Sequence, residues 1–207
     1  MRSAIVLAGG RSTRMSEDKG LKTLGGEPLV GHVIRRVSSH VDEVLLVVGS
    51  EGQRMAYSEV VGNGVKLLVD LYEEGSPLIG AITGLKNATG MYALVTGCDM
   101  PFISPEVVRL LFQEGEGRDG AVFRWPNGWI EPLIAVYKVE PSLRMAMDLY
   151  TSRNLRLRMI LLNLQDVRMI PIESLKDIDP ELLTLYDADT EDALRKAEKI
   201  LERIGER

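Results

Sequence analysis

The chain has 207 residues, 45% of them hydrophobic, and a formal net charge of −5, which is typical of one domain with an ample core and argues against a broad nucleic-acid surface. One cysteine excludes an internal disulfide, and two histidines exclude a Cys/His zinc cluster. No apolar stretch approaches the roughly 20 residues that span a bilayer, and too few residues precede the first predicted strand for a signal peptide, so we expect a soluble cytoplasmic protein.

Apolar runs alternate with helical patterns along the first half of the chain, which predicts an α/β fold with a mostly parallel sheet and helices on both faces. The run at 44–48 is wholly aliphatic, as in a strand that is buried on both sides. The predicted elements are, in order, a strand at 4–7, a helix at 29–40, strands at 44–48 and 65–69, a helix that ends near 88, a strand at 92–96 and a helix that begins at Pro105.

The second half of the chain departs from this alternation of strands and helices. Residues 121–125 and 133–137 flank Pro126-Asn127-Gly128, which predicts a hairpin with a tight turn. The remaining predictions are helices at 142–150 and 155–164, a strand at 167–172, and a last amphipathic helix at 190–204 with Glu191/Arg195 and Asp192/Lys196 pairs.

The most informative segment ends the first predicted strand. The sequence Ile5-Val6-Leu7-Ala8-Gly9-Gly10 is followed within nine residues by Arg11, Arg14 and Lys19. Glycines let a backbone approach a ligand closely, and the cations that follow suit a polyphosphate. The segment therefore predicts a triphosphate-binding loop, although it matches neither the P-loop nor the dinucleotide fingerprint. A glycine turn with solvated charges is the alternative.

Asp99 is the strongest catalytic candidate from the residues alone. It directly follows the predicted strand at 92–96 and Gly97-Cys98, so its carboxylate is expected at the edge of the sheet where the glycine loop lies. A carboxylate beside a triphosphate needs a divalent cation between them, and magnesium commonly binds through one or two carboxylates plus substrate phosphates. A turn or helix-capping aspartate is the alternative.

The pattern Leu-Ala-Gly-Gly-x-x-x-Arg-Met-x-x-Asp-Lys at 7–19 resembles the signature of nucleotidyltransferases, most closely the molybdenum cofactor guanylyltransferases (MobA). The resemblance implies that Arg14, Lys19 and Asp99 are catalytic. Ser16 stands where that family usually has glycine, so the loop is expected to follow a slightly different path. The implied nucleotide-binding residues are Leu7, Ala8, Gly9, Gly10, Arg14, Lys19, Asp70 and Gly80.

The same resemblance implies the metal site. Cys-Asp-x-Pro at 98–101 matches the metal-binding segment of the family, with Asp99 as the ligand. Before the last helix the family has Asn-x-Asn-Thr-Pro-Glu, whereas this chain has Asp187-Ala188-Asp189-Thr190-Glu191. The extra negative charge near the phosphates favours Asp189 as a second metal ligand and leaves Asp187 open. Read alone, Asp189 or Thr190 is a helix cap, and Asp70 is a turn residue.

The acceptor side is implied by two further segments. The sequence Glu131-Pro-Leu-x-Ala matches a family segment near the pterin acceptor, which makes Glu131 a candidate. The basic run at 153–158 is by default a solvated helix face, and the matching family region makes Arg156 the candidate for an acceptor-phosphate clamp. Trp125 and Trp129 favour cross-strand packing over a stacking platform.

The implied reaction is transfer of GMP from GTP to molybdopterin with release of pyrophosphate, dependent on Mg²⁺. The implied fold is a single Rossmann-like domain of the nucleotide-diphospho-sugar transferase type over 1–207, with a nucleotide-binding half at 1–115, and an acceptor-binding half at 116–207 that carries a hairpin and helical insertion and the last helix. No nucleic-acid or membrane partner is expected, and transient contacts with enzymes that make or accept the molybdenum cofactor stay open.

Three alternatives remain from the sequence. One is a molybdopterin cytidylyltransferase, and another is a nucleotidyltransferase that acts on a sugar or lactyl phosphate. The third is a non-catalytic nucleotide-binding module, which the intact Arg14, Lys19 and Asp99 disfavour.

Overall fold

The computed structural model describes residues 1–9 and 18–205, and within them seven strands form one sheet in the order β5-β4-β1-β6-β8-β7-β9. The strands are β1 (Arg2–Leu7), β4 (Glu43–Val48), β5 (Val65–Val69), β6 (Tyr92–Gly97), β7 (Gly120–Arg124), β8 (Ile130–Lys138) and β9 (Val167–Pro171). Two short strands, β2 (Thr23–Leu24) and β3 (Glu27–Pro28), form a separate hairpin.

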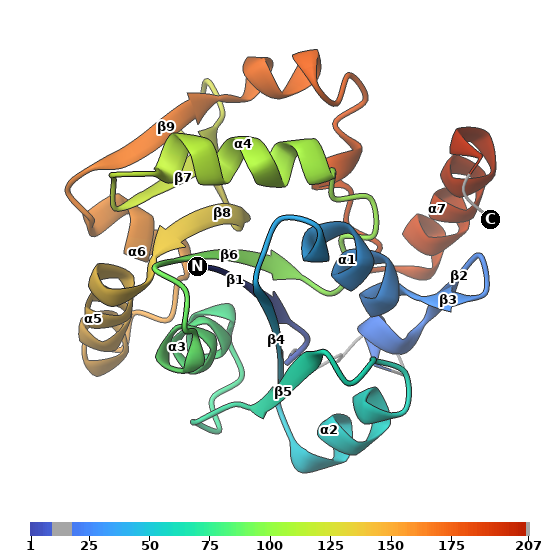
Figure 1. Ribbon diagram of the computed structural model, residues 1–207, viewed down its shortest axis with the longest axis horizontal. Helices are drawn as coiled ribbons and strands as arrows, with labels where there is room; N and C mark the ends of the chain where they lie inside the picture. Colours follow the sequence, from blue (N-terminus) through green and yellow to red (C-terminus); the bar gives the residue numbers. More distant parts are fainter. Residues whose placement is uncertain (10–17, 206–207) are drawn as a thin grey trace.

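Helices connect these strands and cover the sheet (Figure 1). The α-helices are α1 (Leu29–Ser38), α2 (Glu51–Ser58), α3 (Pro77–Asn87), α4 (Pro105–Gly115), α5 (Val139–Thr151), α6 (Arg158–Asn163) and α7 (Glu191–Ile204). Short 3₁₀ turns are η1 (Lys19–Leu21), η2 (Ile172–Asp177) and η3 (Leu183–Leu185). None of the helices in the described part of the chain is both long and apolar enough to cross a bilayer.

The sheet is parallel except around β8. Strand β1 pairs in parallel with β4 and β6, β4 with β5, and β7 with β9, whereas β8 runs antiparallel to β6 and to β7. The carboxyl ends of β1, β4, β5 and β6 therefore meet at one edge, which is where open α/β sheets bind their ligands. The predicted hairpin is confirmed as β7 and β8, and it is built into the main sheet beside β6.

Alternation along each strand divides the core into two layers. On β1, Ala4 and Val6 face a cluster with α1, α2 and α4, whereas Ile5 faces a second cluster with α3, α5 and α6. Because both faces are covered by helices, β1 and β4 read as continuous apolar runs, as parallel strands do. The predicted α/β fold with helices on both faces is confirmed.

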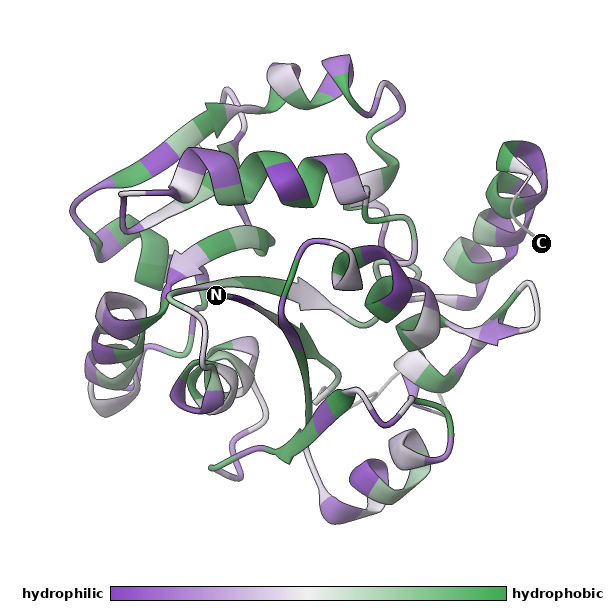
Figure 2. Ribbon diagram, in the orientation of Figure 1, coloured by the Kyte–Doolittle hydropathy of each residue, from purple (hydrophilic) through white to green (hydrophobic). Residues whose placement is uncertain are grey.

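A third, smaller cluster lies outside the sheet and fixes the C-terminal helix. Leu201 and Ala197 of α7 pack against Leu24 and Leu29, next to the β2–β3 hairpin (Figure 1). Helix α7 alternates hydrophobic and hydrophilic residues around its axis, as expected for a helix with one buried face (Figure 2). Thr190 caps it by accepting a hydrogen bond from the backbone N–H of Ala193 at 3.1 Å.

Several local predictions need correction. The helix predicted at 155–164 begins only at Arg158. The helix predicted to end near 88 is confirmed as α3, which begins at Pro77 and is capped by Ser76. Glu191 pairs with Lys22 rather than with Arg195, because α7 docks its first turn against the segment after the glycine loop; the Asp192/Lys196 pair is confirmed. Helix α2 and the β2–β3 hairpin were not predicted.

Candidate functional site

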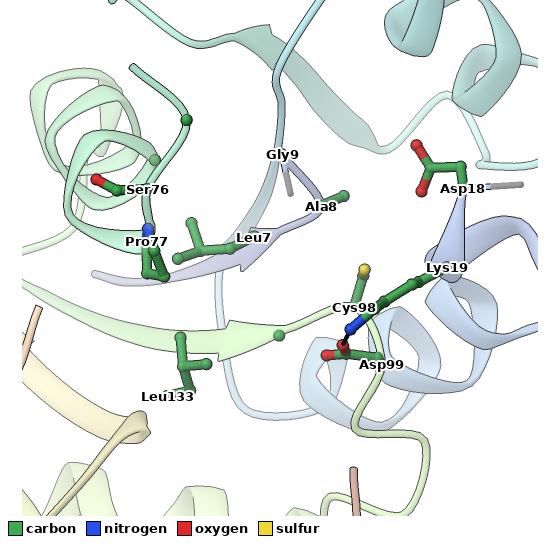
Figure 3. A pocket seen from close by; sticks show the side chains of 13 residues that line it. Leu7, Ala8, Gly9, Asp18, Lys19, Ser76, Pro77, Cys98, Asp99 and Leu133 are labelled. Atoms are coloured by element: carbon green, nitrogen blue, oxygen red, sulfur yellow. Dashed lines mark ion pairs between the residues drawn. The ribbon is translucent and has the colours of Figure 1, made fainter. Parts of the chain in front are cut away.

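A cleft lies at the edge where the carboxyl ends of β1 and β6 meet (Figure 3). The first turn of α3 forms one wall, and Asp18-Lys19 and Asp99 form the opposite wall (Figure 3). The lining residues are Leu7, Ala8, Gly9, Asp18, Lys19, Gly75, Ser76, Pro77, Gly80, Gly97, Cys98, Asp99 and Leu133. Gly10 and Arg14, both predicted to bind the nucleotide, lie outside the described residues.

Gly9 occupies a position that only glycine fits. A Cβ atom there would lie 2.9 Å from Asp70 Oδ2 and 3.0 Å from the backbone nitrogen of Gly49. Because Gly9 has no side chain, the ends of β1, β4 and β5 can pack closely together beneath the cleft. At the opposite wall, a Cβ on Gly80 would lie 3.0 Å from Leu7 Cδ2, so this glycine lets α3 start close against β1.

Asp70 lies behind Gly9, at the end of β5, and it does not line the cleft directly. Its Oδ1 accepts a hydrogen bond from Thr83 Oγ1 at 3.3 Å, whereas its buried Oδ2 has no hydrogen-bond partner among the described residues. Burial raises the pKa of Asp70 to about 6, against the smaller lowering effect of the Thr83 hydroxyl. The structure thus places Asp70 under the cleft, and its contact with a nucleotide stays a prediction.

The Lys19 side chain points toward the carboxylates on its own side of the cleft. Its Nζ forms an ion pair with Asp99 Oδ2 at 3.5 Å, which Figure 3 shows, and lies 3.9 Å from Asp189 Oδ2. The three side chains are 32%, 19% and 39% exposed, so they are open to a ligand that enters the cleft. The structure thus brings together Lys19, Asp99 and Asp189, which come from three distant parts of the sequence.

Asp187 joins the same group from the segment that precedes α7. Burial is the main cause that raises its pKa to about 7, followed by the negative charges of Asp99 and Asp189. Crowded carboxylates repel one another unless a proton or a cation neutralises them. Lys19 supplies only part of that neutralisation.

These carboxylates fit a divalent cation that also has substrate ligands. Among residues 1–9 and 18–205, no three His, Cys, Asp or Glu side chains converge closely enough to hold a metal by themselves. Magnesium typically uses one or two carboxylates and completes its octahedron with water and phosphate oxygens. Asp99, with Asp189 or Asp187, provides a donor set of that kind.

The two predicted acceptor residues have different surroundings. Glu131 accepts a hydrogen bond from Trp125 Nε1 at 2.6 Å, which links the two strands of the β7–β8 hairpin. It lines neither the first cleft nor the pocket that contains Arg156. Arg156 lines a second, apolar pocket that shares Pro77 and Leu133 with the first cleft. The two hollows are therefore neighbours.

Sequence reasoning missed two residues of this second pocket. The half-exposed ring of Trp129 forms part of its wall, and the Arg158 guanidinium lies 4.7 Å from that ring in a cation–π contact. Trp125 donates its backbone N–H to Trp129 O at 2.8 Å, which pairs the two residues across the hairpin. Their rings have different surroundings, since Trp125 packs against the core and Trp129 lines the second pocket, so cross-strand packing of the rings stays a prediction. The arginine-leucine alternation at 153–158 is the signal that pointed to this region.

Cys98 lies at the bottom of the cleft, next to Asp99. Its side chain is buried at the end of β6, and burial raises the pKa of its thiol well above the usual value. A protonated, buried thiol is a poor nucleophile.

Gly9 after the first strand, opposite a lysine and converging carboxylates, forms a cleft of the kind that a nucleotidyltransferase needs for a triphosphate and its metal. Comparison with known proteins agrees. Residues 4–167 match the MobA-like NTP transferase domain. The chain is 32% identical to a probable molybdenum cofactor guanylyltransferase of Methanosarcina mazei, over 99% of this chain and 93% of that protein.

A second relative is a probable molybdenum cofactor guanylyltransferase of Natronomonas pharaonis, 31% identical over 99% of this chain and 98% of that protein. Among solved structures, molybdopterin-guanine dinucleotide biosynthesis protein A from Archaeoglobus fulgidus superposes with a TM-score of 0.82 at 28% identity, covering 98% of this chain and all of that one. The chain belongs to the MobA-like NTP transferase family. It is a nucleotidyltransferase, and enzymes of this kind generally use a divalent metal.

Proposed function

We propose that the protein transfers GMP from GTP to molybdopterin and releases pyrophosphate. The main support for this proposal is the placement of Lys19, Asp99 and Asp189 in the cleft opposite Gly9, in a chain whose relatives are named for this reaction. The terminal phosphate oxygen of the acceptor attacks the α-phosphorus of GTP. The bond from that phosphorus to the bridging oxygen breaks, and pyrophosphate leaves with the electron pair.

The chain's own residues act by positioning and by charge. The acceptor phosphate is already ionised at neutral pH, so the reaction needs no general base. Lys19 stabilises negative charge that develops on the transferred and leaving phosphates, and Arg14 is proposed to assist. Gly9 and Gly80 let the ends of the strands and the start of α3 pack closely around the cleft, which sets the shape of the surface that receives the nucleotide.

We propose Mg²⁺ as the divalent metal, held by Asp99 with Asp189. When bound, it neutralises the phosphates and orients them for in-line attack. Asp187, whose pKa is raised in part by the charge of Asp99, is the alternative second ligand. Asp187 and Asp189 both belong to the segment where the family usually has asparagines.

We further propose that residues 1–115 bind the nucleotide and residues 116–207 bind the acceptor. The first cleft is built mainly from the first part, and the adjoining pocket with Arg156 and Trp129 from the second. The apolar wall suits a flat ring system, and the arginines suit a terminal phosphate. The C-terminal half also contributes Asp187 and Asp189 to the first cleft, so the division is not strict.

The direct test is release of pyrophosphate from GTP that depends on both molybdopterin and Mg²⁺. We expect CTP, ATP and UTP to react much more slowly. Preference for CTP would identify a cytidylyltransferase, and release with a sugar phosphate but not with molybdopterin would overturn the acceptor. Binding of GTP without any turnover would favour a non-catalytic module.

A further inference from the structure

A buried tyrosine outside the cleft contacts the segment that carries the catalytic lysine. Tyr57 of α2 has no exposed surface, and its hydroxyl donates a hydrogen bond to Asp18 Oδ1 at 2.5 Å. The hydroxyl lies in the narrow space between Gly20 and Cys98, where a Cβ added to Gly20 would collide with it. It therefore joins α2, the segment after the glycine loop, and the end of β6 just before Asp99.

The other oxygen of Asp18 is also held from α2. Gln53 donates from Nε2 to Asp18 Oδ2 at 2.5 Å, and its own Oε1 accepts a hydrogen bond from the backbone N–H of Gly49 at 2.7 Å. Burial raises the pKa of Tyr57 far above its usual value, so its hydroxyl remains a donor to this carboxylate. Asp18 is thus fixed by two side chains of one helix.

Asp18 in turn determines where Lys19 begins. Asp18 caps η1 by accepting a hydrogen bond from the backbone N–H of Gly20 at 3.3 Å, and Lys19 is the first residue of that turn. The Lys19 side chain extends from there to within 3.5 Å of Asp99. A long lysine side chain has many rotamers, so a fixed backbone origin limits the positions its ammonium group can reach.

We propose that Tyr57 and Gln53 are positioning residues for Lys19, acting through Asp18 without contacting the substrate. The proposal rests on the proposed role of Lys19 toward the triphosphate. It predicts that the Tyr57 hydroxyl matters for phosphate binding only while Lys19 is present. A tyrosine that merely packs the core would affect binding equally with and without the lysine.

Tyr57→Phe removes the hydroxyl and keeps the ring that fills the core. The test is a double-mutant cycle with Lys19→Ala, read out by calorimetric binding of inorganic tripolyphosphate with Mg²⁺. We expect Tyr57→Phe to weaken binding about tenfold in the wild-type background and less than about twofold in Lys19→Ala, because the lost bond is to a charged group. Tyr92→Phe is the matched control, since its hydroxyl bonds Gly117 and Arg118 at the opposite end of β6.

Gln53→Leu provides a second variant on the half-buried face of α2, in case Tyr57→Phe does not fold. It should show the same dependence on Lys19. Wild-type binding by either folded variant, or an equal loss with and without Lys19, overturns the proposal while leaving the proposed function intact. Tripolyphosphate carries no base, so guanine selectivity does not enter; a wild-type protein that fails to bind it contradicts the proposed function itself.

Discussion

The backbone N–H of Ala188 donates a hydrogen bond to the carbonyl oxygen of Asp99 at 2.8 Å. This bond attaches the segment before α7 to the turn that follows β6. It fixes the backbone at Ala188, so the two neighbouring aspartates, Asp187 and Asp189, are held close to Asp99. Ala188 is itself buried against the β2–β3 hairpin cluster. The C-terminal helix therefore acts as an anchor that brings two carboxylates to the edge of the sheet.

Removal of the central pair should abolish turnover. Lys19→Ala and Asp99→Asn are each expected to reduce the rate of pyrophosphate release by about 100-fold or more, because each removes a charge that acts on the reacting phosphates. The fold should survive, since both side chains are partly exposed and neither packs in the core. Asp166→Asn, which alters an exposed pair with Arg118, is the control and should retain activity.

The two carboxylates before α7 should set the metal requirement. Asp189→Asn is expected to raise the Mg²⁺ concentration for half-maximal activity by about tenfold, as loss of one hard ligand predicts. Parallel titration of Asp187→Asn compares the two candidates. A larger shift for Asp187→Asn would transfer the ligand role to that residue, and unchanged Mg²⁺ dependence in both variants would contradict a second carboxylate ligand.

Asp70 should make stability depend on pH. Burial raises the pKa of Asp70 to about 6 from 3.8, so the folded protein binds this proton more tightly than the unfolded chain does. The stability that protonation provides is complete below about pH 4 and is lost as the pH rises through about 6. The free energy of unfolding of the wild type, relative to Asp70→Asn, should therefore fall between pH 4.5 and pH 7.5.

Urea unfolding at several pH values measures this difference directly. The same comparison with Asp166→Asn, at a surface ion pair, controls for general charge effects. A difference between the wild type and Asp70→Asn that stays constant with pH would show that the Asp70 carboxyl does not titrate as described.

Gly9→Ala tests whether the floor of the cleft must be glycine. The new methyl group would meet backbone atoms of Gly49 as well as the Asp70 carboxyl, so the end of β1 has to shift. We expect a fall in Tm of several degrees, consistent with roughly 1–3 kcal/mol of strain in a well-packed site, together with weaker GTP binding. Gly62→Ala, where nothing lies within 4 Å of an added Cβ, is the control. Equal Tm values for the two variants would refute the tight contact.

Arg156→Ala should separate the two substrates. Its side chain lines the apolar pocket and not the first cleft, so the KM for molybdopterin is expected to rise about tenfold while the Kd for GTP stays unchanged. Arg153→Ala is matched to it, because Arg153 is highly exposed and pairs with Glu74. If GTP binding weakens and the KM for molybdopterin does not change, the assignment of the second pocket is wrong.

The buried strands could be predicted because their information is local. A run such as Val44–Val48 has no polar residue, and only a strand covered on both faces accommodates it. The position of Asp99 followed from the same logic, since a residue just after a parallel strand lies at the ligand-binding edge. Fold class and the first carboxylate were thus both accessible from the sequence.

The missing elements depend on partners far along the chain. Helix α2 has only a short apolar pattern, and it is held by Tyr57, whose partner Asp18 lies 39 residues away. Arg195 lies one helical turn from Glu191, which predicts an ion pair within the helix. In the structure Glu191 instead pairs with Lys22, because α7 packs beside the segment that contains Lys22. Local spacing cannot anticipate such contacts, because they exist only after the sheet and hairpin have assembled.

The most direct test of the account is calorimetric titration of GTP, CTP, ATP and UTP with Mg²⁺ into the wild type and Asp99→Asn. We predict selective binding of GTP to the wild type, and weaker binding that no longer depends on Mg²⁺ in the variant. Selective binding of CTP would move the protein to cytidylyl transfer. Failure of the wild type to bind any nucleoside triphosphate would contradict the central claim that this cleft holds the nucleotide.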